Sequence, residues 1–166
     1  MPQRRHVLAM LAALFVGVVA CTKPAPPTAN NIIPSDRVAP SPVGTTQTVL
    51  QKTFNLKGSA AFPFEIPAHS AQPHLHGIFE SFAGQVHGAS DETANIDFVI
   101  LSEEQQTDSA SHRASEAMFS VEASHNQAVN FDLPPSLNHP VKYYLVFRDP
   151  NGKDGKVVEA NFRVDF

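Results

Sequence analysis

The sequence predicts an all-β protein: a single antiparallel β-sandwich or jelly roll of about eight strands with one short helical insertion. In the C-terminal stretch KVVEANFRVDF, apolar residues alternate with polar ones: Val158, Ala160, Phe162, Val164 and Phe166. That alternation is typical of a strand with one face in a core and the other in water. Segments 95–102 and 141–149 are apolar on both faces, so we expect them at the centres of the sheets.

Three other segments show the same alternation. They predict three core-facing sets: Phe62, Phe64 and Ile66; Phe119, Val121 and Ala123; and Val129, Phe131 and Leu133. The stretch SEEQQTDSASHRASEA lacks a strand pattern, and Ser102 followed by Gln105 fits a capping box, which predicts a short helix there. Twelve phenylalanines and no tryptophan predict a core dominated by phenylalanine.

Residues 1–20 predict a lipoprotein signal peptide. Arg4 and Arg5 precede an apolar run at 7–20, which is the order of a secretory leader. A run of about 14 residues is too short to span a hydrocarbon core of about 30 Å as a helix. The sequence Val-Val-Ala-Cys that ends at Cys21 resembles the lipobox of bacterial lipoproteins, in which the cysteine is acylated and becomes the mature N-terminus.

This resemblance implies a location in the bacterial cell envelope, facing the periplasm or the surface, with the membrane as a partner through acylated Cys21. Thr22 is not the aspartate that retains many lipoproteins in the inner membrane, which favours the outer membrane. Acylation of the only cysteine would leave no thiol for a disulfide or a metal.

A tether is predicted at residues 21–47, before the sandwich domain at 48–166. Six prolines lie between Lys23 and Val43, and no apolar periodicity accompanies them. Such a segment does not bury enough surface to offset the entropy of ordering it, so we expect disorder. The formal net charge of −4 provides no basic footprint for nucleic acid, so no nucleic-acid partner is predicted.

The segment VKYYLVFRDPNGKDGKVVEANFRVDF, preceded by AVNFDLPPSLN, resembles the closing hairpin of emp24/GOLD-like β-sandwiches. The earlier FEIPAHSAQPHLHGIFESF and ANIDFVILSEEQ are similar to the preceding strands, so the resemblance covers roughly residues 60–166. The chain departs from the family in having no cysteine pair in the domain and Asp149 where asparagine is common. The resemblance implies a GOLD-like sandwich that is used for binding, and it transfers no catalytic residue.

Histidines are the candidate metal ligands. On a strand, residues two apart point the same way, so His74 and His76 would present two imidazoles to one metal, with His69 or His87 as a third ligand. Copper or zinc suits such nitrogen ligands. The alternative is a pair of surface histidines, which face solvent if Leu75 points inward. Blue-copper chemistry is excluded because it needs a cysteine thiolate and the domain has none.

The loop DPNGKDG at 149–155 starts like a calcium loop but lacks its later ligands. Ala160 stands where the bidentate glutamate is required, so the loop is interpreted as a turn-rich hairpin connection. No nucleophile elbow, HExxH motif or glycine-rich phosphate loop occurs, and no catalytic residue is predicted.

Two surfaces are candidates for partner binding. Tyr143 and Tyr144 are adjacent in a strand, so one should point inward and the other outward. An exposed tyrosine would anchor a protein or glycan partner, and packing between the sheets is the alternative. The polar stretch 105–115 is the second candidate surface.

Three functions remain open from the sequence. The leading hypothesis is a lipid-anchored envelope sandwich that acts as a non-catalytic binding or accessory module for a protein or polymer partner, without a cofactor. The second is a periplasmic copper- or zinc-binding protein that uses the His74 and His76 cluster. The third is an unrecognised hydrolase whose residues come together only in the fold.

Overall fold

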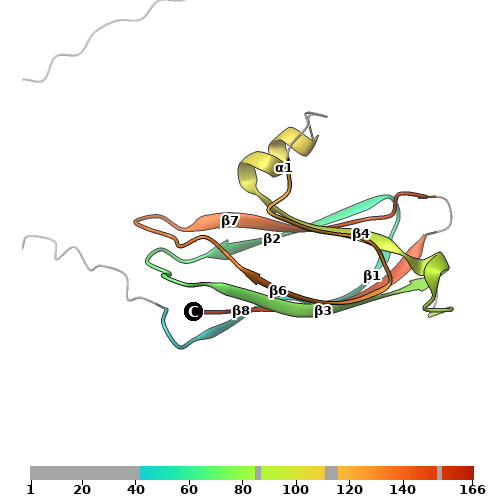
Figure 1. The fold of residues 1–166 in the computed structure, drawn as a ribbon, viewed down its shortest axis with the longest axis horizontal. Coiled ribbons are helices and arrows are strands. Elements are labelled where there is room, and N and C mark those ends of the chain that lie inside the picture. The colour runs from blue at the N-terminus through green and yellow to red at the C-terminus, as the bar shows by residue number, and fades with distance from the viewer. Residues whose placement is uncertain (1–41, 85–86, 111–115, 153–154) are drawn as a thin grey trace, which may run out of the picture. The chain divides into compact units, whose positions relative to one another are not determined.

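The computed structural model describes residues 42–84, 87–110, 116–152 and 155–166. Its strands in chain order are β1 (Thr46–Leu56), β2 (Ser59–Ile66), β3 (His74–Ala83), β4 (Ile96–Ser102), β5 (Phe119–Ser124), β6 (Asn126–Asp132), β7 (Val141–Arg148) and β8 (Lys156–Asp165). A 3-10 turn, η1 (Glu92–Ala94), precedes β4, and a helix, α1 (Glu103–Ala110), follows it. The strands form two layers (Figure 1), which confirms the predicted all-β sandwich with one short helix.

Each layer is a four-stranded antiparallel sheet. Sheet A has the order β1-β8-β3-β6, and sheet B has the order β2-β7-β4-β5. The first strand therefore pairs with the eighth, the second with the seventh, the third with the sixth and the fourth with the fifth. One long antiparallel hairpin wrapped into two sheets produces this pairing, which is the arrangement of an eight-stranded jelly roll.

The core lies between the sheets and is rich in phenylalanine, as predicted. Phe79 and Phe162 from sheet A meet Phe98 and Phe147 from sheet B, and all four side chains are fully buried. Phe98 stacks on Phe162 with 5.2 Å between ring centroids, and Phe79 meets Phe147 edge-on at 5.8 Å. Offset and edge-on contacts of this kind add to the free energy that burial itself provides.

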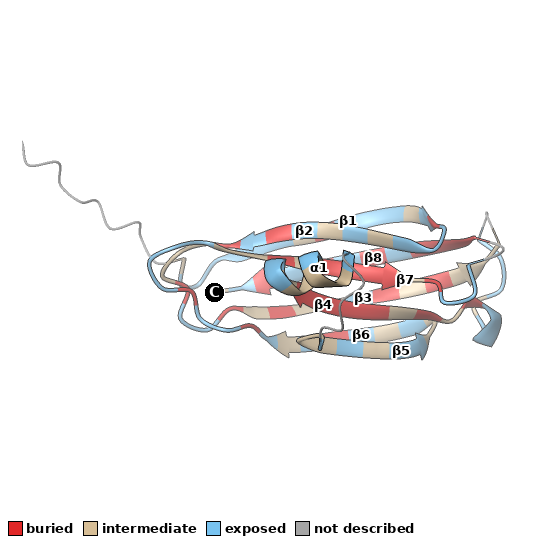
Figure 2. Cartoon of the chain, turned by 90° about the horizontal axis from the view of Figure 1, so that it is seen from above, coloured by how far each residue is buried: buried red, intermediate tan, exposed pale blue. Residues whose placement is uncertain are grey.

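The two segments that are apolar on both faces form β4 and β7, the central strands of sheet B, as predicted. Their second apolar face is used on the outside of the sheet, where Val99, Leu101 and Val146 form a small buried cluster with Tyr144. Helix α1 packs against β4 and β7 there, and the burial colouring shows buried strand residues beside it (Figure 2).

The predicted capping box begins α1. The backbone N–H of Gln105 donates to Oγ of Ser102 at 3.2 Å, and the backbone N–H of Ser102 donates to Oε1 of Gln105 at 2.8 Å. The two residues satisfy each other's backbone donors, so the chain turns from a central strand directly into a helix.

The predicted leader, Cys21 and the tether as far as residue 41 lie outside the described residues. Within the described ranges, no helix has both the length and the apolar character needed to cross a membrane.

Candidate functional site

His74 and His76 lie side by side on the outer surface of sheet A. Leu75 between them is fully buried, so the alternation of β3 turns both imidazoles outward. Their ring centroids are 6.0 Å apart and the ring planes differ by 18°, which is a stacked arrangement. The shared face that the spacing predicts is therefore present.

Each imidazole has its own carboxylate. Nδ1 of His74 lies 2.6 Å from Oδ1 of Asp132 on β6, and Nε2 of His76 lies 3.2 Å from Oδ2 of Asp165 on β8. The second pair is close enough for an ion pair but is not aligned as a hydrogen bond. The hydroxyl of Thr46 donates to Asp165 at 2.6 Å and, together with the charges of the two imidazoles, lowers the pKa of that carboxyl.

The structure does not bring the other two candidate ligands to this pair. His87 packs its ring on Phe82 at 4.7 Å and places Nε2 3.3 Å from Glu159, and His69 lies in the connection between β2 and β3. Across the described ranges, no group of three or more His, Cys, Asp or Glu is arranged to hold a metal ion. The two strand histidines share a face because of their spacing, whereas His69 and His87 belong to the connections before and after β3.

Only one of the two candidate tyrosines reaches the surface. Tyr143 is 3% exposed and packs on Phe64 at 5.7 Å, and burial raises the pKa of its hydroxyl. Tyr144 points to the outer side of sheet B, where Lys142 lies 5.3 Å from its ring. In the predicted contact stretch, residues 105–110 belong to α1 and residues 111–115 lie outside the described ranges.

A broader candidate site is the outward-facing surface of sheet A, which we call the amide face. Its residues are Gln51 and Thr53 of β1, His76, Ile78 and Glu80 of β3, Asn130 of β6, and Glu159, Asn161 and Arg163 of β8. The register aligns them in rows, because Ile78 lies opposite Asn161 and His76 lies between Asn130 and Arg163. Carboxamides, hydroxyls, carboxylates and a guanidinium therefore share one surface.

Two hollows adjoin each other on the amide face. One has a volume of about 400 Å³ and is bounded by β1, β3 and β8, and the other has a volume of about 450 Å³ and is bounded by β3, β6 and β8. Ile78 and Asn161 line both hollows. Ile78 is 48% exposed, so the middle of the face offers an apolar contact between polar groups.

A third hollow opens at one end of the sandwich, and we call it the end pocket. Its volume is about 590 Å³, and its lining residues are Ala83, Gly84, Thr93, Asp149, Asn151, Gly155 and Lys156. It is more enclosed than the two hollows on the amide face.

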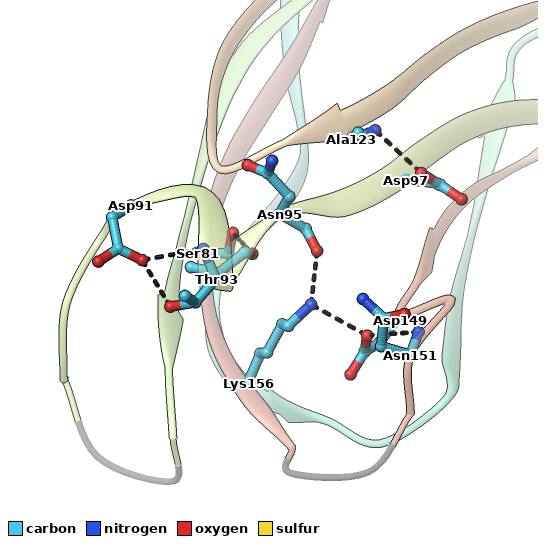
Figure 3. Close-up of polar contacts among 10 residues, drawn as sticks. Ser81, Asp91, Thr93, Asn95, Asp97, Ala123, Asp149, Asn151 and Lys156 are labelled. Atoms are coloured by element: carbon cyan, nitrogen blue, oxygen red, sulfur yellow. Dashed lines mark hydrogen bonds and ion pairs between the residues drawn. The ribbon is translucent and has the colours of Figure 1, made fainter.

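A buried ion pair forms one wall of the end pocket. Nζ of Lys156 donates to Oδ1 of Asp149 at 2.9 Å and to the carbonyl oxygen of Asn95 at 2.5 Å, as Figure 3 shows. The side chains of Lys156 and Asp149 are only 8% and 2% exposed. Burial would raise the pKa of Asp149, but the Lys156 ammonium and the backbone N–H groups of Gly152 and Asn151 bring it below its ordinary value.

Sequence reasoning missed this pair, although a signal was present. The alternation of β8 places Lys156 in the same inward phase as Val158 and Ala160, and a lysine in that phase requires a buried partner. Asp149 lies directly after β7, at the same end of the sandwich. The carbonyl of Asn95 belongs to the backbone, so no residue type marks it.

The chain matches no known protein-family model, and comparison with curated proteins gives no significant match.

Proposed function

We propose that this chain is a lipid-anchored cell-envelope protein whose jelly roll binds a hydroxyl-rich polymer, a glycan chain, along the amide face without catalysing its breakdown. The observation that carries the proposal is the pair of adjoining hollows on that face, which share Ile78 and Asn161. Two neighbouring hollows on a flat sheet fit consecutive units of one extended chain.

The chemistry of the amide face favours a polyhydroxylated partner. A carboxamide both donates and accepts hydrogen bonds, as a sugar hydroxyl does, and three carboxamides line the two hollows: Gln51, Asn130 and Asn161. Arg163 adds donors, while Glu80 and Glu159 add acceptors. Ile78 supplies an apolar contact for the face of a sugar ring that carries C–H groups.

The sequence supports the proposed anchor. The lipobox at Cys21 and the proline-rich segment after it would attach the domain to a membrane at a distance, as expected for a module that reaches a polymer beside that membrane. The resemblance to emp24/GOLD-like sandwiches also supports binding over catalysis.

The test is co-sedimentation of the purified full-length protein, in detergent, with insoluble peptidoglycan and with immobilised neutral and anionic envelope glycans. The informative variant is Asn130→Ala with Asn161→Ala, since both residues are exposed on the amide face and their loss leaves the core intact. Each lost hydrogen bond is worth about 0.5–1.5 kcal/mol, so we expect binding to weaken by about tenfold or more.

The matched control is Asn138→Ala, which removes an exposed carboxamide from the connection between β6 and β7, away from the amide face. It should bind as the unmodified protein does. The proposal would be refuted if the protein bound none of the glycans tested, or if the double variant bound them as tightly as the unmodified protein does. If a protein is captured instead, and its capture depends on Asn130 and Asn161, the polymer proposal is refuted and the amide face is a protein interface.

A further inference from the structure

The end pocket is a second site, separate from the amide face. Lys156 points inward between the sheets, whereas Glu159 and Asn161 on the same strand point outward. The described walls of the pocket come from the end of β3, from η1, from Asp149 and Asn151 after β7, and from Gly155 with the first residue of β8. Residues from these segments lie near one another in the close-up of Figure 3. A volume of about 590 Å³ falls within the range of pockets that hold small molecules.

Stability alone does not account for the ion pair in this wall. Burying two charges costs several kcal/mol per ion, and a well-packed apolar pair of similar volume often stabilises a fold as well or better. Lys156 and Asp149 are nevertheless almost fully buried and line an open pocket. The combination points to a role in recognising a ligand.

The hydrogen-bonding groups of the pocket define what it would recognise. An ammonium has three N–H donors, and within the described residues Lys156 gives one to Asn95 and one to Asp149, which leaves one for a ligand. Thr93 donates its hydroxyl hydrogen to Asp91 at 2.5 Å, so toward the pocket it acts as an acceptor. Asn151 uses its backbone N–H on Asp149, and its side-chain amide both donates and accepts.

The charges that the described residues place at the pocket disfavour an ionic ligand. The charge of Lys156 is balanced by Asp149, so a cation would meet an ammonium that already occupies the carboxylate. An anion would approach Asp91 and Glu92, which lie beside Thr93 in η1 and its cap. From these contacts we infer that the end pocket binds an uncharged, hydroxyl-bearing small molecule of the sugar or polyol class.

The test observes the Lys156 ammonium directly. The full-length protein, labelled with ¹⁵N at lysine Nζ and held in detergent, is titrated with methyl glucoside, trehalose and glycerol, and separately with acetate and phosphate. A buried, hydrogen-bonded ammonium exchanges slowly with water, so its signal reports an arriving acceptor. We expect a saturable shift of the Lys156 signal with at least one neutral probe and none with the two anions.

Two variants test the pocket without disturbing the ion pair. Thr93→Val removes the hydroxyl acceptor and keeps a side chain of similar shape. Asn151→Ala removes the side-chain amide and keeps the backbone hydrogen bond to Asp149. Each should weaken the titration about five- to tenfold, whereas Asn130→Ala with Asn161→Ala on the amide face should leave it unchanged.

The inference is overturned if no neutral probe moves the Lys156 signal, if acetate or phosphate moves it instead, or if Thr93→Val and Asn151→Ala leave the titration unchanged. These outcomes are independent of glycan binding on the amide face, which depends on other residues. Either site can therefore fail in its own experiment without affecting the result for the other.

Discussion

Gly77 and Phe162 face each other across β3 and β8 at a separation that leaves no space for a side chain on residue 77. A Cβ there would lie 2.6 Å from Cδ1 of Phe162 and would also contact the carbonyl oxygen of Asn161. Gly77 pairs with Phe162 in the register of β3 and β8, and the Phe162 ring is fully buried in the core. His76 and Ile78, on either side of Gly77, are therefore presented on the amide face.

We predict that Gly77→Ala destabilises the fold by about 1–3 kcal/mol, because an overpacked core must shift side chains and backbone. Urea unfolding measures the change. Adding Phe162→Leu should not restore stability, since the contact with the backbone of Asn161 remains. A free energy of unfolding within about 0.5 kcal/mol of the parent would contradict this prediction, because it would mean that β3 and β8 move apart to admit the methyl group without loss of stability.

A double-mutant cycle tests the ion pair of the end pocket. Lys156→Met leaves the buried Asp149 carboxylate without its partner, so we expect the free energy of unfolding to fall by about 3 kcal/mol or more. Asp149→Leu should lower the free energy of unfolding by a similar amount, because it leaves the buried Lys156 ammonium without its carboxylate. The double variant should be more stable than either single variant. Additive losses would mean that the two charges are stabilised separately.

The pKa of Asp149 predicts an acid-sensitive contribution to stability. Its folded pKa lies below the ordinary value of 3.8, so the ion pair stabilises the fold above that value and loses this effect as the pH falls through the folded pKa. The difference in free energy of unfolding between the parent and Asp149→Asn should therefore shrink as the pH falls below about 5. Chemical unfolding across that range measures it, and a constant difference would contradict the assignment.

Loss of the capping box should loosen α1 and leave the sandwich intact. Ser102→Ala removes the hydroxyl that accepts from Gln105, at a cost of about 1 kcal/mol. Hydrogen exchange of the α1 amides should accelerate several-fold, while that of β4 stays the same. Thr107→Ala serves as the control, because it removes a hydroxyl of the same helix that donates to the carbonyl of Glu103 and caps no backbone N–H. Equal acceleration in both variants would argue against the cap.

Local patterns predicted much of this fold. The alternation in β8 predicted its inward and outward residues because the side-chain period of a strand is two. The apolar character of 95–102 and 141–149 on both faces predicted the two central strands of sheet B, since one face meets the core and the other meets α1. Ser102 and Gln105 predicted the start of the helix, because a capping box is contained within four residues.

The long-range features could not be predicted. Pairing of β1 with β8 joins the two ends of the domain, and no local signal specifies which strands share a sheet. The same limit applies to the sites. His74 and His76 share a face because they are two apart, but the position of His87 depends on the path of the connection that follows β3. The end pocket combines a backbone carbonyl at Asn95 with side chains about 55–60 residues later in the chain.

Site-specific photocrosslinking in the cell tests most directly the proposal that a glycan binds to the amide face. A photoreactive side chain is placed at Ile78, in the middle of the face, and at Leu137, which is exposed in the connection between β6 and β7. We predict that position 78 captures a large product that glycan-cleaving enzymes convert to a small adduct, and that position 137 captures none. A protease-sensitive, glycanase-resistant product at position 78, or equal glycan capture from both positions, would contradict the account.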